Sequence, residues 1–186
     1  MALFVYGGSF NPPHLAHVLA LCVARSLASD FEGALVVPTF HHPLGKDLAP
    51  FEDRVAMATA AMGWVPGVTI SRIEEELGGD SRTLRTLQEL QKRHPGRTFR
   101  LLVGADILLE RAKWHAFDEI ERIAPPFVLG RVGIEHEEAP VAHLPDISST
   151  AVREAAARGD WPAVAARVPA LVLDYLRAHS LYEHRA

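Results

Sequence analysis

The chain has 186 residues, of which 48% are hydrophobic and 23% are charged, the balance of an ordinary globular protein. Its formal net charge of −4 gives no electrostatic basis for binding a nucleic acid, and no apolar run approaches the roughly 18–20 residues of a membrane-spanning helix. The single cysteine, Cys22, excludes an intrachain disulfide, and the residues before Gly7 are too few for a signal peptide, so we expect a cytoplasmic protein.

Short apolar segments alternate with segments of helical periodicity along the chain. Strands are predicted at Leu3 to Tyr6, Ala34 to Val37, Val68 to Ile73, Phe99 to Val103 and Phe127 to Leu129. Helices are predicted around Leu15 to Cys22, at Phe51 to Met62, at Ser81 to His94 with Ser81 as the N-cap, in short pieces over 105–122, and from Thr150 onward with interruptions at Pro162 and Pro169. The stretch from Arg131 to Pro145 is polar, and we expect it to be irregular.

Continuous apolar strands that alternate with helices indicate an α/β fold, in which helices cover both faces of a parallel sheet. We expect a doubly wound, mostly parallel sheet followed by a helical C-terminal segment. No internal repeat, low-complexity tract or linker divides the chain, so residues 1–186 are predicted to form one domain. Such sheets bind ligands beyond the carboxyl ends of their strands, and the loops that follow strands are therefore the candidate sites.

The loop after the first strand runs from Gly7 to His17. Its glycines allow the backbone to approach a ligand closely, and Pro12 and Pro13 direct the chain into the next helix. The start of that helix offers free N–H groups and a positive dipole end, which suit a phosphate. Neither the spacing of a dinucleotide fingerprint nor the Gly-Lys-Ser/Thr of a Walker loop is present.

His14 and His17 are three residues apart at the start of this helix, so their side chains share a face. A helical wheel places both histidines to one side of the apolar stripe, which consists of Leu15, Val18, Leu19 and Cys22. The residues alone leave three interpretations open: structural histidines, a zinc pair for which no third ligand is suitably spaced, and contacts to phosphate.

A second loop, from Asp146 to Glu154, comes just before the C-terminal helical segment. Three consecutive hydroxyl residues, Ser148, Ser149 and Thr150, offer helix caps and donors for an anion. Arg153 follows in the first turn, where its planar guanidinium suits phosphate oxygens. By itself the segment is equally well explained as an ordinary capped helix with a surface arginine.

The two loops together resemble the signatures of the nicotinate/nicotinamide mononucleotide adenylyltransferases, within the HIGH-type nucleotidyltransferase superfamily. The first loop is similar to the His-x-Gly-His segment of that family, with Ala16 in place of the glycine. The segment Ile147-Ser148-Ser149-Thr150-x-x-Arg153 is similar to the second signature, and the ending Leu181-Tyr182 also fits. The resemblance covers nearly the whole chain and implies a Rossmann-like nucleotidyltransferase fold.

The resemblance implies an enzyme that transfers the adenylyl group of ATP to a pyridine mononucleotide and releases pyrophosphate. It assigns catalytic roles to His14, His17 and Arg153. It assigns ATP binding to these three residues and to Gly7, Gly8, Ser9, Phe10, Gly104, Asp106, Ile147, Ser148, Ser149 and Thr150. Asp106 follows a predicted strand and either accepts ribose hydroxyl groups or caps the next helix.

The mononucleotide is expected to contact Asn11, Lys46, Arg54, Thr83 and Trp114. Trp114 either stacks on the pyridine ring or is an ordinary core residue, and Lys46 and Arg54 are either ligand contacts or solvated charges. Thr83 lies in a segment similar to the family's Ser-Tyr-Thr-x-x-Thr-Leu, in which Arg82 occupies the tyrosine position.

The attacking phosphate is already an anion, so the implied reaction needs alignment and charge neutralisation rather than a general base. Mg²⁺ is the expected cofactor, bound mainly through the ATP phosphates and water rather than by a protein cage. The expected substrates are small molecules, with no nucleic acid or membrane partner, and the sequence is compatible with an oligomer. We favour nicotinate over nicotinamide mononucleotide as the acceptor. The alternatives are another small adenylyltransferase, such as the phosphopantetheine type, and a nucleotide-binding regulator without turnover.

Overall fold

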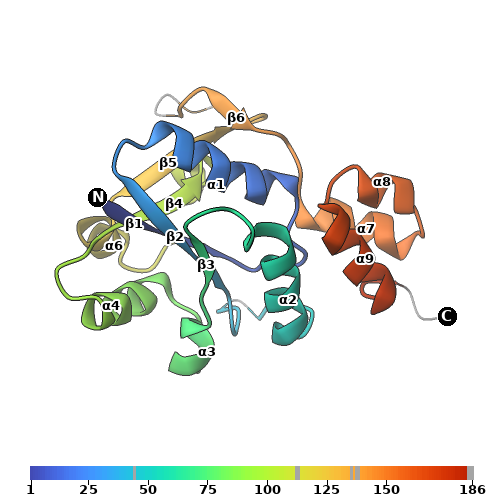
Figure 1. The fold of residues 1–186 in the computed structure, drawn as a ribbon, viewed down its shortest axis with the longest axis horizontal. Helices are drawn as coiled ribbons and strands as arrows, with labels where there is room; N and C mark the ends of the chain where they lie inside the picture. Colours follow the sequence, from blue (N-terminus) through green and yellow to red (C-terminus); the bar gives the residue numbers. More distant parts are fainter. Residues whose placement is uncertain (44, 112–113, 135, 137–138, 184–186) are drawn as a thin grey trace.

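The computed structural model describes residues 1–43, 45–111, 114–134, 136 and 139–183. Its core is a six-stranded sheet in which all neighbouring strands run parallel, in the order β3-β2-β1-β4-β5-β6 (Figure 1). The strands are β1 (Ala2–Gly8), β2 (Phe31–Pro38), β3 (Val68–Ile70), β4 (Thr98–Gly104), β5 (Pro126–Arg131) and β6 (Ala142–Leu144). The prediction of a doubly wound parallel sheet is confirmed.

The winding of the chain creates a crevice in the middle of the sheet. β1 lies between β2 and β4 and is paired with both. From β1 the chain winds outward through β2 to β3, and then returns to β4 and winds outward through β5 to β6. Because the winding direction reverses between β1 and β4, their carboxyl ends flank the topological switch point, where doubly wound sheets bind ligands.

Helices cover both faces of the sheet (Figure 1). One face carries α1 (Leu15–Leu27) and α2 (Phe51–Met62), with α7 (Ser149–Ala157), α8 (Trp161–Ala165) and α9 (Ala170–Ala178) packed on the same side. The other face carries α3 (Ile73–Leu77), α4 (Thr83–Arg93) and α6 (Phe117–Ile123), while α5 (Asp106–Glu110) follows β4 directly. No helix of the described residues has the length and apolar character needed to cross a membrane.

Two hydrophobic clusters, one on each face, hold the helices to the sheet. Consecutive residues of a strand point to opposite faces, so Phe4 belongs to the first cluster and Val5 to the second. Leu102 and Leu101 divide in the same way, and all four residues are at most 2% exposed. Burial on both faces explains why the strands are continuous apolar runs rather than alternating ones.

Two strand predictions need correction. β3 ends at Ile70, and the chain then forms α3 from Ile73 onward, where we expected the strand to continue. We expected the stretch 131–145 to be irregular, but it contains β6, a short edge strand that pairs with β5. Residues 135, 137 and 138 of that stretch lie outside the described residues.

Two helix boundaries also differ from the prediction. α4 begins at Thr83, and Ser81 does not cap it. The Ser81 hydroxyl instead accepts a hydrogen bond from the Phe40 N–H at 2.9 Å, which ties the loop after β2 to the start of α4. Pro162 does not interrupt a helix, because it lies in the first turn of α8, where its missing N–H is not needed. The break between α7 and α8 contains Gly159, whose φ is 69°.

The buried face of α1 is not the one that the helical wheel predicted. Leu15 and Leu19 are 40% and 37% exposed. The residues of α1 that are at most 6% exposed are Ala16, Ala20, Leu21 and Ala24. Small side chains let the helix lie close to the sheet, and the dispersion energy of this close packing outweighs the greater hydrophobicity of the two leucines.

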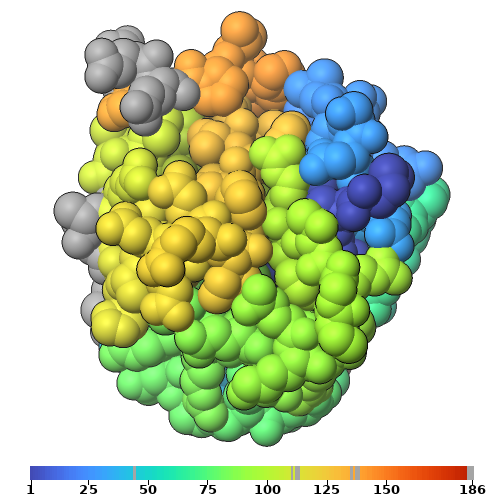
Figure 2. Space-filling model, turned by 90° about the vertical axis from the view of Figure 1, so that its left-hand side faces the viewer, coloured from blue at the N-terminus to red at the C-terminus, as the bar shows by residue number. Residues whose placement is uncertain are grey.

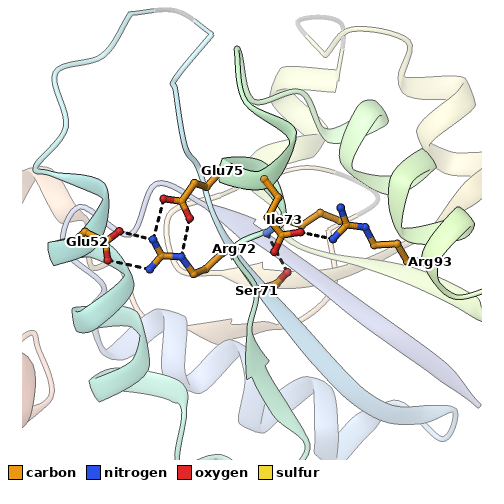
Figure 3. A network of polar contacts seen from close by, with 7 residues as sticks. Glu52, Ser71, Arg72, Ile73, Glu75 and Arg93 are labelled. Atoms are coloured by element: carbon orange, nitrogen blue, oxygen red, sulfur yellow. Dashed lines mark hydrogen bonds and ion pairs between the residues drawn. The ribbon is translucent and has the colours of Figure 1, made fainter.

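Charged side chains form a surface network beside α2 and α3 (Figure 3). Arg72 donates to Glu52 of α2 and to Glu75 of α3, and its guanidinium lies 5.3 Å from the ring centroid of Phe51. The partners are largely solvent-exposed, so each of these ion pairs contributes little to stability.

The C-terminal helices occupy one end of the molecule. α9 packs against α2, at the end opposite α4 and α6 (Figure 1). The face formed by α4, α6 and β5 shows no part of these helices (Figure 2). α9 therefore meets the rest of the molecule on the side of α2.

Candidate functional site

A cavity of about 220 Å³ opens at the carboxyl ends of β1 and β4. Its walls also include the start of α1, the start of α5, the end of β5 and the start of α7. The residues that line it are Tyr6, His14, Ala16, His17, Ala20, Val103, Gly104, Asp106, Arg131, Leu144, Ile147, Ser148 and Ser149. The fold thus brings parts of both predicted loops together at the switch point of the sheet.

The two histidines of the first loop lie against each other in this cavity. Their ring centroids are 3.7 Å apart and their planes are inclined by 25°. The backbone N–H of His14 donates to Nδ1 of His17 at 3.0 Å, so the proton of a neutral His17 ring is on Nε2. Nδ1 of His14 is buried and has no hydrogen-bond partner among the described residues. The Nε2–H of His17 is therefore the ring donor that remains for a ligand.

Burial keeps both histidines uncharged. Burial, with a smaller contribution from Arg131, lowers the pKa of His14 to about 4. Burial also lowers the pKa of His17 well below its usual range, and His14 and Arg131 act in the same direction. The free protein presents two neutral imidazoles, and an anion bound beside them would raise the pKa of each.

Arg131, at the end of β5, brings a positive charge to the cavity wall, and the sequence analysis did not identify it. Its guanidinium lies 3.3 Å from the carboxylate of Asp106 and 3.1 Å from that of Asp146, and it donates to the Ile147 carbonyl oxygen at 2.9 Å. In the sequence, Arg131 only follows a predicted strand. That position points to the cavity only once β5 is known to pair with β4.

The turn after β1 is built around the buried ring of Phe10. This residue has a φ of 46°, and its ring lies edge-on to Tyr6 and His17, at centroid distances of 5.7 and 5.1 Å. A Cβ atom on Gly8 would lie 3.0 Å from the ring, so glycine permits this close approach. Phe10 therefore supports the His17 ring by an edge-on contact.

The second loop is joined to the backbone of the first. The Ser148 hydroxyl caps α7, and Ser149 Oγ donates to the Pro12 carbonyl oxygen at 2.8 Å. Arg153 donates from Nη1 to the Asn11 carbonyl oxygen, also at 2.8 Å. These contacts connect residues about 140 positions apart and set the distance between the two loops.

The structure divides the predicted site residues into two groups. Those that line the cavity are His14, His17, Gly104, Asp106, Ile147, Ser148 and Ser149. Those that lie outside its wall are Gly7, Gly8, Ser9, Phe10, Asn11, Lys46, Arg54, Thr83, Trp114, Thr150 and Arg153. All the residues expected at the mononucleotide fall in the second group.

Arg54 is 1% exposed, so the alternative of a solvated surface charge is wrong for this residue. Its Nε donates to the Ala49 carbonyl oxygen at 2.9 Å, and Nη1 donates to the carbonyl oxygens of Ser9 and Thr39 at 3.0 and 2.6 Å. The guanidinium also lies 5.4 Å from the Phe51 ring centroid. Arg54 thereby holds together the loops that follow β1 and β2.

Glu74 of α3 is a second buried charge near these loops, and the sequence analysis missed it. Its carboxylate accepts the Phe40 N–H and the Thr86 hydroxyl, each at 3.1 Å. Burial raises the pKa of the Glu74 carboxyl, while its hydrogen bonds and the charge of Arg54 oppose the rise. Glu74 links the loop after β2 to α4.

Trp114 and the start of α4 lie on the same face of the sheet. Trp114 is half-buried against the second hydrophobic cluster, and its ring is edge-on to Phe117 at a centroid distance of 6.1 Å. Leu84 packs against the same cluster, immediately after Thr83, the first residue of α4. Lys46 is exposed in the loop between β2 and α2. The side chains expected at the mononucleotide thus belong to several separate elements.

Within the described part of the chain, no three histidine, cysteine, aspartate or glutamate side chains converge on a possible metal ion. The zinc interpretation of His14 and His17 therefore lacks a third ligand there. Asp106 is the carboxylate in the cavity wall, and it is paired with Arg131. This donor set fits a divalent cation that is held mainly by phosphate oxygens and water.

The chain is similar in sequence and in fold to known proteins. Residues 5–155 match the family model described as cytidylyltransferase-like. A probable nicotinate-nucleotide adenylyltransferase of Anaeromyxobacter sp. (strain K) is 46% identical over 180 residues, which cover 95% of this chain and 94% of that protein. The probable nicotinate-nucleotide adenylyltransferase of Myxococcus xanthus is 38% identical, with coverages of 95% and 92%. The solved structure of Plasmodium falciparum nicotinic acid mononucleotide adenylyltransferase complexed with APC has a TM-score of 0.80 at 20% identity, and the match covers 97% and 96% of the two chains.

Proposed function

Because this chain belongs to the nicotinate-nucleotide adenylyltransferases of the cytidylyltransferase-like family, we propose that it transfers the adenylyl group of ATP to nicotinate mononucleotide. The protein is a nucleotidyltransferase, and the products are deamido-NAD and pyrophosphate. The observation that carries the proposal is the pair of stacked, neutral imidazoles at the start of α1, which share one cavity with the start of α7. We expect it to act in NAD biosynthesis, in the cytoplasm and as one domain.

In the proposed reaction, an oxygen of the mononucleotide phosphate attacks the α-phosphorus of ATP. The new P–O bond forms as the bond between the α-phosphorus and the oxygen that bridges it to the β-phosphorus breaks. That oxygen takes the electron pair and leaves as part of pyrophosphate. The attacking oxygen is already ionised, so the protein has to align the two substrates and stabilise negative charge.

We assign His17 to the charge that develops at the reacting phosphate. Its Nδ1 is occupied by the His14 backbone N–H, which leaves Nε2–H as the free donor. The ring contacts both His14 and Phe10, so this donor is oriented before the substrate binds. A preoriented donor whose hydrogen bond strengthens as negative charge accumulates stabilises the transition state more than the ground state.

The N-terminus of α7 is assigned to the outer phosphates of ATP. Ser148 and Ser149 line the cavity there, where free N–H groups and the helix dipole favour an anion. Arg131 donates to the Ile147 carbonyl oxygen beside the start of α7 and supplies positive charge there, and we add it to the residues that contact phosphate. Arg153 is assigned to the leaving pyrophosphate and Asp106 to the ribose hydroxyl groups.

The mononucleotide is proposed to bind on the side of Trp114 and the start of α4. Trp114 offers a half-buried aromatic face, and the first N–H groups of α4, from Thr83 on, have no partners within the helix. The carboxylate of nicotinate suits a helix N-terminus better than a neutral amide does, which supports nicotinate over nicotinamide. Lys46 is assigned to the mononucleotide phosphate, and Arg54 acts by holding Ser9 and Thr39 in place.

Mg²⁺ is the proposed cofactor, and when bound it would neutralise part of the charge of the phosphates. Phosphate oxygens and water would be its main ligands, because Asp106, a carboxylate that lines the cavity, is paired with Arg131.

Steady-state kinetics test the proposed function. Pyrophosphate release is measured with ATP and Mg²⁺ in the presence of nicotinate mononucleotide, nicotinamide mononucleotide or phosphopantetheine. We expect the highest kcat/KM with nicotinate mononucleotide. A higher kcat/KM with the nicotinamide compound would overturn the choice of substrate, and release with phosphopantetheine alone would overturn the class of acceptor. No release with any acceptor at saturating concentration would indicate a nucleotide-binding regulator.

A further inference from the structure

Tyr182, near the end of the chain, reaches the first loop. Its hydroxyl donates to Oδ1 of Asn11 at 2.6 Å, and Asn11 is only 3% exposed. The same Oδ1 atom accepts the backbone N–H of Ala49 at 3.0 Å. The carbonyl oxygen of Asn11 accepts Nη1 of Arg153. Asn11 therefore joins the first loop to the loop before α2 and to α7, and Tyr182 adds a second hydrogen bond to its amide oxygen.

We propose that Tyr182 is a positioning residue for adenylyl transfer, whose hydroxyl fixes the Asn11 amide and thereby the placement of the loop that carries Lys46. The inference rests on the proposed function, because it assigns a role within the same site. The proposal does not require Tyr182 to contact a substrate. Tyr182 acts through Asn11 and Ala49, the residues that it holds.

The hydrogen bonds decide which way the Asn11 amide faces. An asparagine side chain presents either its oxygen or its NH₂ group to a neighbour. The Ala49 N–H is a donor only, and its short distance to Oδ1 places the oxygen of the amide on that side. Burial raises the pKa of the Tyr182 phenol, so it stays protonated and donates to the same oxygen. The NH₂ group of Asn11 donates to no other group in the described part of the chain.

The chain adopts an uncommon turn to bring Tyr182 to Asn11. After α9, both Ser180 and Tyr182 have positive φ, 47° and 65°, which residues other than glycine rarely adopt. Leu181 between them donates its N–H to the Leu176 carbonyl oxygen at 3.0 Å and packs against the first hydrophobic cluster. Backbone strain that packing maintains, next to a proposed substrate loop, is the pattern found at functional sites.

The same segment provides a matched control. Tyr175 of α9 donates its hydroxyl to Oδ1 of Asp53 in α2 at 2.8 Å. This contact also joins the C-terminal segment to the rest of the protein, but Asp53 has no assigned role at the site. Tyr175→Phe and Tyr182→Phe each remove one phenolic oxygen, and only the second change affects Asn11.

The kinetic test compares both variants in the wild-type background and in an Asn11→Ala background. We expect Tyr182→Phe to raise the KM for the mononucleotide about fivefold, as the loss of one neutral hydrogen bond implies, with an ATP KM within about twofold of wild type. Tyr175→Phe should leave both KM values unchanged. In the Asn11→Ala background, Tyr182→Phe should add less than about a twofold effect, because its partner is gone. Equal effects in both backgrounds, or a mononucleotide KM that matches that of Tyr175→Phe, would overturn the proposal.

Hydrogen exchange of the Ala49 amide tests the same contact without turnover. We expect this amide to exchange several-fold faster in Tyr182→Phe than in wild type, and at the wild-type rate in Tyr175→Phe. An unchanged rate in Tyr182→Phe would show that the phenol does not hold Asn11. A wild-type protein that releases no pyrophosphate would refute the proposed function but would leave the exchange result to decide the role of Tyr182.

Discussion

The backbone N–H of His14 donates to Nδ1 of His17 at 3.0 Å, while the rings of the two residues stack at a centroid distance of 3.7 Å. The hydrogen bond requires an unprotonated Nδ1 on His17, and the stacking disfavours two positive charges so close together. Arg131 on the same cavity wall disfavours them further. The pair is therefore neutral until an anion is bound, and this has consequences for stability and for catalysis.

Acid should destabilise the free protein through His14. Its pKa is about 4 in the folded chain and about 6.5 in an unfolded one, so between these values the unfolded state binds the additional proton. Stability is complete above about pH 6.5 and falls as the pH is lowered toward 4, by up to about 1.4 kcal/mol per pH unit for this group. Chemical denaturation of wild type and of His14→Gln from pH 7.5 to 4.5 measures the difference in slope. Identical slopes for the two proteins would contradict the depressed pKa of His14.

His17→Ala should fold and lose turnover. It removes the oriented Nε2–H donor, and the loss of one such donor costs about 10²–10³ in rate, or about 2.7–4 kcal/mol. His17→Asn is the informative companion, because its amide oxygen can still accept the His14 N–H while the ring donor is absent. Both variants should show the same large loss of kcat. A kcat near that of wild type in either purified variant would remove His17 from the reaction.

Arg153→Ala should impair the use of ATP more than the use of the mononucleotide, because Arg153 is assigned to the leaving pyrophosphate. Arg153→Lys should restore activity only in part, since an ammonium group cannot reproduce the two-pronged geometry of a guanidinium. The contact from Nη1 to the Asn11 carbonyl oxygen gives the lysine variant a further deficit in loop placement. Steady-state kinetics with each substrate varied in turn test this assignment. Unchanged KM for ATP and unchanged kcat in Arg153→Ala would exclude it.

Arg54→Met should destabilise the fold, by about 3 kcal/mol or more, because it leaves several partly buried carbonyl oxygens without a donor. Arg72→Met is the matched control, since Arg72 makes its ion pairs at the surface beside α2 and such pairs contribute about 0–1 kcal/mol (Figure 3). Urea denaturation of both variants gives the comparison. Equal losses would mean that burial of the Arg54 guanidinium is not what holds the two loops.

Trp114→Ala should raise the KM for the mononucleotide and leave ATP binding nearly intact. A stacking contact is worth about 0.5–1.5 kcal/mol beyond burial, whereas removing a tryptophan that is purely core costs about 3–5 kcal/mol of stability. Trp114→Phe should keep most of the affinity, since it preserves a flat ring. Thermal unfolding and mononucleotide titration on the same protein separate the two roles. A large fall in melting temperature with unchanged affinity would assign Trp114 to the core.

The sequence alone determined the class of fold and the position of the two loops. Its five predicted strands are all present, because a strand buried on both faces must be a continuous apolar run, and that pattern is visible in one dimension. The pairing of His14 with His17 was also visible, because residues three apart at a helix start share a face. Local rules were sufficient where the relevant partners are near in sequence.

The tertiary structure decided what depends on distant partners. The residues next to Arg54 in the sequence could not show whether its side chain is solvated or buried, because its acceptors lie in the loops that follow β1 and β2. Arg131 became a cavity residue only through the pairing of β5 with β4. α1 buries its alanines rather than Leu15 and Leu19, because the distance between helix and sheet selects for size as well as for hydrophobicity. Tyr182 meets Asn11 across 171 positions, and no local propensity specifies which buried acceptor a distant hydroxyl will reach.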